Sequence, residues 1–539
     1  MRALFDTLIK NARVIDGSGN GAFPADVAIQ DGVIAAVGKL GDASAFETVD
    51  ARGRFLTPGF IDIHRHADAA VFRDGFGKAE LSQGLTTIIN GNCGLSLAPL
   101  GGTHAEETVR YLTPITGGIP PELRFDSLKA YFDAARQRPL PLNTGMLVGM
   151  GTLRTFVAGF AAGDLDFFQE RALHYHLEAA LADGALGVSL GLGYAPEIFY
   201  STDGLIRALA PLYQSGVPLC VHMRQEGDGV VDALREMIEV AKALKTPLQI
   251  SHLKAIGKRN WRKAVPKMLS LIERARDDGI DVMCDVYPYT AGSTQLLHVL
   301  PPEFQEGGTQ QLLRALCDNS KRAEMRERME TGRDFENITD LVGFENVIAT
   351  GLHRAENRPF EGKSIAEIAR LRQSDPYDAL FDLLASEEGT PTMIDFITHD
   401  DDIRDILTKP YSGVISDATY PTAGQCHPRV YGTFARLIEQ YVVKEKCLTL
   451  EQAVHKVTMQ PAERFGLTYK GRITVDADAD LLLFDSANIH ERGTYQSPDI
   501  PAEGFDYVFV NGEAAIAEGK LMVACNGGVL RPDLGEEVY

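Results

Sequence analysis

The centre of the chain alternates between short apolar runs and amphipathic stretches. Apolar runs of strand length end in polar residues in GALGVSLGLG, VPLCVHMR, TPLQISHLK, IDVMCDVYPY and YSGVISDAT, and helical patterns such as DGVVDALREMIEVAKAL lie between them. Repeated strand–helix units of this kind are typical of parallel α/β folds. Residues 57–464 therefore predict a (β/α)8 barrel of the TIM type or a doubly wound sheet. The barrel is favoured, because no GxGxxG turn follows the first strand.

Both ends of the chain show a different pattern, with short apolar alternations separated by Gly and Asn. Residues 1–56 contain DTLIKNARVID and ADVAIQDGVIAAVG, and residues 465–539 contain ADLLLFD, FDYVFVNGEAAIAEG and LMVAC. Alternation with a period of two indicates strands with one buried face. We predict that the two termini together form one small β-sandwich domain beside the barrel.

One stretch interrupts the alternation within the barrel region. Residues from about 290 to 350 form a long segment between two predicted barrel strands. Because long insertions in compact domains usually serve function, we predict a lid or small subdomain over the site.

Composition narrows the classes of function. The 539 residues are 45% hydrophobic and 24% charged, as in a soluble globular protein, and the formal net charge is −21. Such a charge disfavours nucleic acid and anionic membranes as partners. Seven cysteines without a close-spaced pair indicate reduced thiols. The N-terminal segment has neither a signal-peptide nor a transit-peptide pattern, and no apolar run predicts a transmembrane helix. We expect a cytoplasmic protein that acts on a small molecule.

The first predicted barrel strand ends in FIDIHRHAD, which places His64 and His66 two residues apart. Side chains alternate across a strand, so both imidazoles face the same side where the strand ends. Taken alone, the pair could equally be two histidines in a surface loop.

The residues at the ends of other predicted strands favour a functional site over a surface loop. VPLCVHMR supplies His222, TPLQISHLK supplies His252, TTIINGNCG supplies Cys93 and YSGVISDAT supplies Asp417. The carboxyl ends of barrel strands carry the catalytic groups in this fold. Imidazoles together with a thiolate suit zinc, and we predict a zinc site here. The alternatives for single residues are a buried apolar cysteine at Cys93 and a helix N-cap at Asp417.

Several longer motifs resemble one family. TPGFIDIHRHAD resembles the His-x-His signature of the amidohydrolase superfamily. TTIINGNCGLSLAP, GALGVSLGLGY, HMRQEGDGV, ISHLKAIGKRNW, DVYPYTAGST, HPRVYGTF and AERFGLTYKGRITVDADADLLLFD resemble segments of its N-acyl-D-amino-acid deacylase (D-aminoacylase) branch. The resemblance spans nearly the whole chain and keeps the order of the motifs. It implies zinc-dependent hydrolysis of N-acyl-D-amino acids to a carboxylate and a free D-amino acid.

The resemblance also implies the ligand set. Cys93, His222 and His252 would hold one tightly bound zinc ion. His64 and His66 would form a second, weaker site, with Cys93 as the bridge that a carboxylated lysine provides in many other amidohydrolases.

Asp417 would carry the reaction. A metal ion lowers the pKa of bound water and polarises the amide carbonyl. A carboxylate nearby can take the proton from water and give it to the departing amine.

The α-carboxylate of the substrate needs a partner, and Arg429 in HPRVYGTF is the best candidate. The resemblance suggests Lys254, Tyr287 and Ser293 as further contacts. The alternatives are a surface ion pair for Arg429 and core packing for Tyr287. Glu226 and Arg224, which follow a predicted ligand, are expected to support the ligands.

Two features bear on the substrate. Relatives read Gly-His-Gly before TLR, whereas this chain has Met150 in GMGTLR, which could alter the substrate but not the metal ligands. The stretch 287–313, expected to line the side-chain pocket, has no Arg or Lys. Because an acidic side chain would then lack a counter-charge, we predict a neutral or hydrophobic D-amino acid.

Other functions remain open on the same site. A cyclic amidohydrolase of the hydantoinase or dihydroorotase type, or a deaminase, would use similar metal ligands. A non-catalytic binding protein on the same barrel is a third alternative, which the presence of all five metal-ligand residues and Asp417 disfavours.

Overall fold

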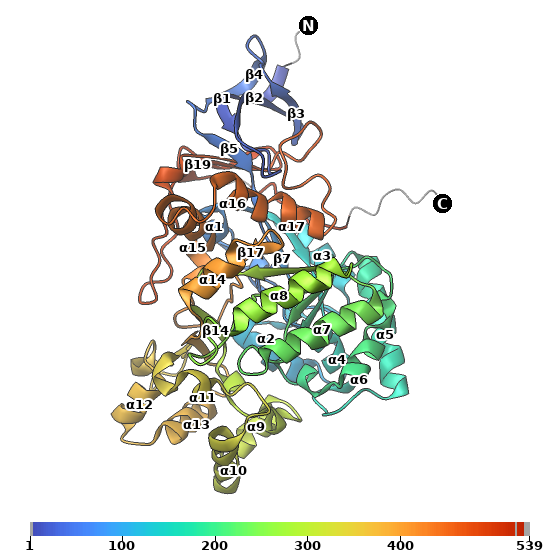
Figure 1. Cartoon of the computed structure of the whole chain (residues 1–539), viewed down its shortest axis with the longest axis vertical. Coiled ribbons are helices and arrows are strands. Elements are labelled where there is room, and N and C mark those ends of the chain that lie inside the picture. Colours follow the sequence, from blue (N-terminus) through green and yellow to red (C-terminus); the bar gives the residue numbers. More distant parts are fainter. Residues whose placement is uncertain (1–3, 523–524, 533–539) are drawn as a thin grey trace.

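The computed structural model describes residues 4–522 and 525–532. Figure 1 shows three parts, with a β-domain at one end, a barrel in the middle and a group of helices at the opposite end. None of the helices in the described ranges is long and apolar enough to cross a membrane.

The barrel consists of parallel strands in sequence order. Hydrogen bonds define two sheets, ordered β6-β7-β8 and β9-β10-β11-β12-β13-β17. β8 and β9 are separated only by Leu147 and act as one strand, because β8 pairs with β7 and β9 pairs with β10. The strands are β6 (Phe60–Asp62), β7 (Leu85–Asn90), β8 (Asn143–Met146), β9 (Val148–Gly149), β10 (Val188–Gly191), β11 (Leu219–His222), β12 (Leu248–Ile250), β13 (Val282–Val286) and β17 (Ser412–Val414).

The ring closes between the last and first strands through the residues that follow them. The backbone N–H of Asp417 donates to the His64 carbonyl at 2.9 Å, and the backbone N–H of His66 donates to the Ala418 carbonyl at 2.9 Å. The predicted α/β barrel is confirmed, and the doubly wound alternative is excluded by this closure.

Helices cover the outside of the barrel. In α7, Val230, Ala233, Leu234, Met237, Val240, Ala241 and Leu244 are buried, a spacing that puts one apolar face against the strands. The outer helices include α1 (Lys78–Leu81), α2 (Ala105–Thr116), α3 (Leu128–Arg136), α4 (Met150–Ala158), α5 (Phe167–Asp183), α6 (Thr202–Ala208), α7 (Val230–Leu244), α8 (Ala264–Asp277), α14 (Asp400–Leu407), α15 (Arg429–Arg436), α16 (Leu450–Lys456) and α17 (Met459–Arg464).

Both ends of the chain enter one sheet. Its main path runs β21-β20-β19-β18-β5-β1-β2-β3, and β4 pairs with β1. The strands are β1 (Leu4–Val14), β2 (Phe23–Gln30), β3 (Val33–Gly38), β4 (Ser44–Asp50), β5 (Phe55–Pro58), β18 (Leu481–Phe484), β19 (Phe505–Val510), β20 (Glu513–Ala517) and β21 (Lys520–Leu521). The prediction that both termini build one additional domain, expected as a small β-sandwich, is confirmed, and hydrogen bonds join the described strands of that domain edge to edge in a single sheet.

Strand β18 shows how this sheet is attached. Leu481 and Leu483 pack in the sheet's own apolar cluster, whereas Leu482 and Phe484 pack in the main cluster of the barrel. The alternation of a strand thus gives each cluster one face of β18. The limits 1–56, 57–464 and 465–539 stay predictions, and residues 1–3, 523–524 and 533–539 lie outside the described residues. Of the predicted strand segments at the C-terminal end, LMVAC (521–525) falls partly there.

The inserted segment, which we define as residues 291–397, has its own sheet and core. Its strands are ordered β14-β16-β15 and are antiparallel, and a separate apolar cluster packs beneath them. The elements are β14 (Ala291–Gln295), α9 (Thr309–Leu316), α10 (Asn319–Thr331), α11 (Ile338–Val342), β15 (Val347–Thr350), α12 (Ile365–Arg372), α13 (Pro376–Ser386) and β16 (Thr392–Phe396). It therefore extends well past residue 350, because the later apolar run TMIDF pairs with β14 and does not join the barrel.

Arg65 lies between the two histidines of the first strand and points to the opposite side. Its guanidinium is fully buried and donates to Glu80 Oε1 at 2.7 Å, Asp62 Oδ2 at 3.2 Å and Ser416 Oγ at 3.1 Å. Ser416 precedes Asp417, so this network ties the first strand to the last.

We predict that Arg65→Met lowers the free energy of unfolding by about 3–5 kcal/mol, because two buried carboxylates lose their counter-charge. Denaturant unfolding followed by circular dichroism measures the change. Arg235→Met is the matched control, since the Arg235 side chain is 59% exposed in a surface pair with Asp232. Equal effects of the two substitutions would contradict the role of the buried network.

Candidate metal centre

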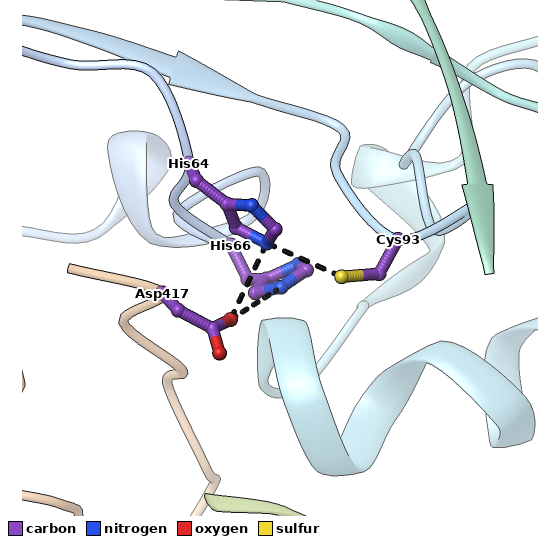
Figure 2. A group of neighbouring side chains, drawn as sticks. All are labelled: His64, His66, Cys93 and Asp417. Atoms are coloured by element: carbon purple, nitrogen blue, oxygen red, sulfur yellow. Dashed lines mark hydrogen bonds and ion pairs between the residues drawn. The ribbon is translucent and has the colours of Figure 1, made fainter. Parts of the chain in front are cut away.

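The five predicted metal ligands and Asp417 meet at the carboxyl ends of the barrel strands. His64 and His66 follow β6, Cys93 follows β7, His222 ends β11, His252 follows β12 and Asp417 follows β17. All six residues are buried. Figure 2 shows four of them, His64, His66, Cys93 and Asp417, pointing toward one another. The surface-loop alternative for the two histidines is thereby excluded.

One group of ligand atoms comes from Cys93, His222 and His252, which lie within 4.8 Å of one another. The Cys93 Sγ atom is 3.5 Å from His252 Nε2, and His222 Nδ1 is 3.2 Å from the same nitrogen. Tetrahedral zinc with ordinary Zn–S and Zn–N bonds holds such atoms roughly 3.5 Å apart. The spacing therefore fits one shared metal ion.

A second group comprises His64, His66, Cys93 and Asp417. Cys93 Sγ lies 3.2 Å from His64 Nε2, and Asp417 Oδ1 lies 3.4 Å from His64 Nε2 and 3.3 Å from His66 Nε2. Because Cys93 belongs to both groups, its sulfur is placed where it could bridge two ions.

Three of these residues have an unusual backbone. The φ angles of Cys93, His252 and Asp417 are 53°, 37° and 51°, in the left-handed region that residues with a side chain seldom adopt. Nearby hydrogen bonds hold these turns. His252 N–H donates to Asp285 Oδ1 at 2.6 Å, and Asn92 Nδ2 donates to the Ile63 and Ile89 carbonyls at 3.2 and 3.1 Å. Backbone strain of this kind is typical of functional sites and here turns the side chains inward.

The protonation states that burial favours for the histidines suit the binding of a metal cation at the centre. Burial lowers the pKa of His222 and His252 well below the usual range, so both imidazoles are neutral and able to bind metal. Burial raises the pKa of the Cys93 thiol, and the Asp417 carboxylate raises it further. A thiolate here needs a positive charge beside it, which a bound metal ion would supply. One thiol, four imidazoles and a carboxylate form a donor set that fits zinc.

Arg429 lies directly behind Asp417. Its Nη1 atom is 3.0 Å from Asp417 Oδ2, and its Nη2 atom donates to the Ser293 carbonyl at 2.8 Å. Burial alone would raise the pKa of Asp417, but Arg429 and His64 hold it well below its usual range. Arg429 is fully buried, so it is not a surface ion pair. No helix starts directly after Asp417 in the described chain, since the next, α15, begins at Arg429, and the N-cap alternative is excluded.

Glu226 and Lys254 contact the predicted ligand His252. Glu226 Oε1 is 3.0 Å from His252 Nδ1, and Lys254 Nζ is 2.6 Å from Glu226 Oε2. Glu226 thus orients the imidazole from its far side. Arg224, by contrast, pairs with Glu236 at 2.8 Å and with the Ile198 carbonyl, away from the ligands.

A pocket of about 490 Å³, partly open to solvent, lies over the centre. The predicted contacts Lys254, Tyr287 and Ser293 line it, whereas Arg429 and Met150 are not among its lining residues. Met150 is fully buried in the main apolar cluster. His298 lies in the stretch expected to line the pocket and does line it, whereas sequence reasoning missed two buried carboxylates of the wall, Glu336 and Asp395. The sequence offered one signal for Asp395, which is the single carboxylate inside the apolar run TMIDF.

A closed parallel barrel with a thiol, imidazoles and a carboxylate gathered at its mouth is typical of metal-dependent barrel hydrolases. The chain belongs to the amidohydrolase family, whose model matches residues 47–516. It is 33% identical over 511 residues to a D-aminoacylase of Alcaligenes xylosoxydans xylosoxydans, covering 94% of each chain. An N-acyl-D-glutamate deacylase of the same organism is 32% identical over 525 residues, covering 96% of this chain and 95% of the relative.

A solved structure shows the same fold. The N-acyl-D-glutamate deacylase of Bordetella bronchiseptica, complexed with zinc and a phosphonate inhibitor, matches with a TM-score of 0.83 at 29% identity, over 98% of this chain and 100% of that chain. The resemblance to the deacylase branch is confirmed, and the protein is an amidohydrolase.

We expect the purified protein to contain at least one zinc ion per chain, and Cys93→Ala to lose most of it, because both ligand groups share this sulfur. Inductively coupled plasma mass spectrometry measures the metal. Cys317→Ala is the control, since Cys317 is an exposed free cysteine. Retention of full zinc content by Cys93→Ala would contradict the assignment.

Proposed function

We propose that the protein is a zinc-dependent hydrolase that splits the amide bond of N-acyl-D-amino acids into a carboxylate and a free D-amino acid. The observation that carries the proposal is the convergence of Cys93, the histidines and Asp417 around one point beneath a pocket. The names of two relatives, D-aminoacylase and N-acyl-D-glutamate deacylase, point to the same substrate class.

The metal would be held as the ligand geometry suggests. Cys93, His222 and His252 would bind one zinc ion tightly, and His64 and His66 would form a second, weaker site with Cys93 as the bridge. A bound zinc ion activates water and polarises the amide carbonyl.

Asp417 would move the proton. Its Oδ1 atom faces His64 and His66, and the contact with Arg429 on Oδ2 keeps the carboxylate ionised. An ionised carboxylate can take a proton from the attacking water. It can then deliver the proton to the departing nitrogen, which makes the amine a better leaving group.

The α-carboxylate would bind at the wall formed by Tyr287 and Ser293. Both residues line the pocket, and neither hydroxyl has a hydrogen-bond partner among the described residues. Lys254 lines the same pocket and adds a positive charge that it shares with Glu226. Arg429 lies behind this wall, 4.8 Å from the Tyr287 ring centroid. We propose that it acts mainly by holding Asp417, Tyr287 and Ser293 in place, while its direct contact with the carboxylate stays a prediction.

The pocket is unsuited to an acidic side chain. Leu95, Ile115, Ile256, Ile338 and Ile397 form apolar parts of its wall, and Glu336 and Asp395 add negative charge. A substrate carboxylate placed beside these groups would lack a counter-charge. This supports the exclusion of D-aspartate and D-glutamate derivatives expected from sequence.

A substrate panel tests the proposed reaction. Zinc-loaded protein is assayed for amine release from N-acetyl and N-formyl derivatives of D- and L-amino acids, with hydantoins alongside. We expect turnover of D-isomers only. Hydrolysis confined to L-isomers or to hydantoins would overturn the proposal.

Asp417→Asn tests the proton carrier. We predict a fall in kcat of about 10²- to 10⁴-fold, because the amide keeps the shape but cannot take the proton. Asp232→Asn is the control, since the Asp232 side chain is 83% exposed on α7. Zinc content is measured on the same samples, and full activity in Asp417→Asn with normal zinc would refute the role.

A further inference from the structure

Asp395 is a buried carboxylate without a partner. It lies on β16 of the inserted segment, is only 3% exposed and lines the pocket over the metal centre. Within residues 4–522 and 525–532, no hydrogen bond or ion pair reaches its side chain. Most buried polar groups in proteins are hydrogen-bonded, and an unpaired buried carboxylate is costly. A group from outside the chain is therefore the natural partner.

The charged neighbours of Asp395 are already engaged. The Glu336 carboxylate accepts from the backbone N–H of Glu226 and lies 3.3 Å from His298 Nε2. The Lys254 ammonium lies 2.7 and 2.6 Å from the two oxygens of Glu226. Burial raises the pKa of Asp395 to about 6, with Lys254 and His298 only partly offsetting the shift. This part of the pocket therefore has more hydrogen-bond acceptors than donors. Among the described residues, no cation there is free to pair with Asp395.

The position of Asp395 shows which part of a substrate it would meet. Gly292 and Asp395 are paired across β14 and β16. A side chain at Gly292 would meet Asp395 Oδ1 at 3.0 Å and the Tyr287 hydroxyl at 3.2 Å, so these two groups border the same space. Tyr287 and Ser293 are the residues proposed above to bind the α-carboxylate. Asp395 therefore faces the amino-acid half of the substrate and not its acyl half.

We propose that Asp395 is a specificity-determining residue that binds a hydrogen-bond donor on the side chain of the D-amino acid, with a cationic ammonium or guanidinium group preferred. The inference rests on the proposed deacylase function. It keeps the exclusion of acidic side chains but differs from the sequence-based expectation of a neutral or hydrophobic one. A charge-assisted hydrogen bond to a desolvated carboxylate selects for a basic side chain over an aliphatic one of equal length.

The test compares substrates that differ only at the end of the side chain. N-acetyl-D-lysine and N-acetyl-D-norleucine have equal chain lengths and differ in the terminal ammonium. We expect kcat/KM to be roughly 10- to 100-fold higher for the lysine derivative, as for a hydrogen bond to a charged group. N-acetyl-D-glutamate should be the poorest substrate.

Variants assign the preference to Asp395. In Asp395→Leu, the ratio of kcat/KM for the lysine and norleucine derivatives should fall to about one or below, and Asp395→Asn should give an intermediate ratio. The Asn variant provides the same readout if the Leu variant does not fold. Asp382→Asn is the control, because the Asp382 side chain is 50% exposed on α13 of the same inserted segment. An unchanged ratio in the Asp395 variants would overturn the assignment.

A further arm separates the two halves of the substrate. Glycyl-D-norleucine carries its amine on the acyl side. The ratio of kcat/KM for glycyl-D-norleucine and N-acetyl-D-norleucine is compared with the ratio for N-acetyl-D-lysine and N-acetyl-D-norleucine. A larger value of the first ratio would overturn the inference. Equal or better hydrolysis of N-acetyl-D-norleucine than of N-acetyl-D-lysine would also overturn it, while leaving the deacylase function intact. Absence of hydrolysis across all N-acyl-D-amino acids would instead refute the function itself.

Discussion

The closure of the barrel between its last and first strands is the contact on which the site depends. The Asp417 N–H donates to the His64 carbonyl, and the His66 N–H donates to Ala418. These bonds join the two strands and at the same time bring the Asp417 carboxylate against both imidazoles. Arg65 makes the closure costly to open, because its buried guanidinium donates hydrogen bonds both to Asp62 at the end of the first strand and to Ser416 just after the last. One set of hydrogen bonds therefore supports both the fold and the arrangement of the reacting groups.

The convergence of the predicted metal ligands at one mouth of the barrel could be expected from the sequence because of the geometry of parallel strands. Strands that run in one direction around a barrel end at one mouth, so residues after each strand must be neighbours there. Cys93, His222 and His252 could be placed together on that ground alone. The left-handed φ angles of Cys93 and His252 could not be predicted, since only a few per cent of residues with a side chain adopt that region.

The pocket was predicted less well, for two physical reasons. Asp395 lies on an antiparallel strand of the inserted segment, and an apolar run such as TMIDF has the same pattern in either kind of sheet. Its place on the pocket wall depends on pairing with β14, about which local sequence carries no information. Arg429 was expected to meet the substrate, but the side to which a buried guanidinium points depends on packing, and here it meets Asp417 from behind.

The inserted segment leaves the barrel after β13 and returns before β17, and these two strands are hydrogen-bonded neighbours, with Cys284 opposite Ser412. The ring is thus continuous whatever chain connects them. The segment also has its own apolar cluster, distinct from that of the barrel. Recombination at this junction could exchange the part of the pocket wall that this segment supplies, while every predicted metal ligand stays in place. Relatives could in this way diverge in substrate without passing through an inactive ancestor.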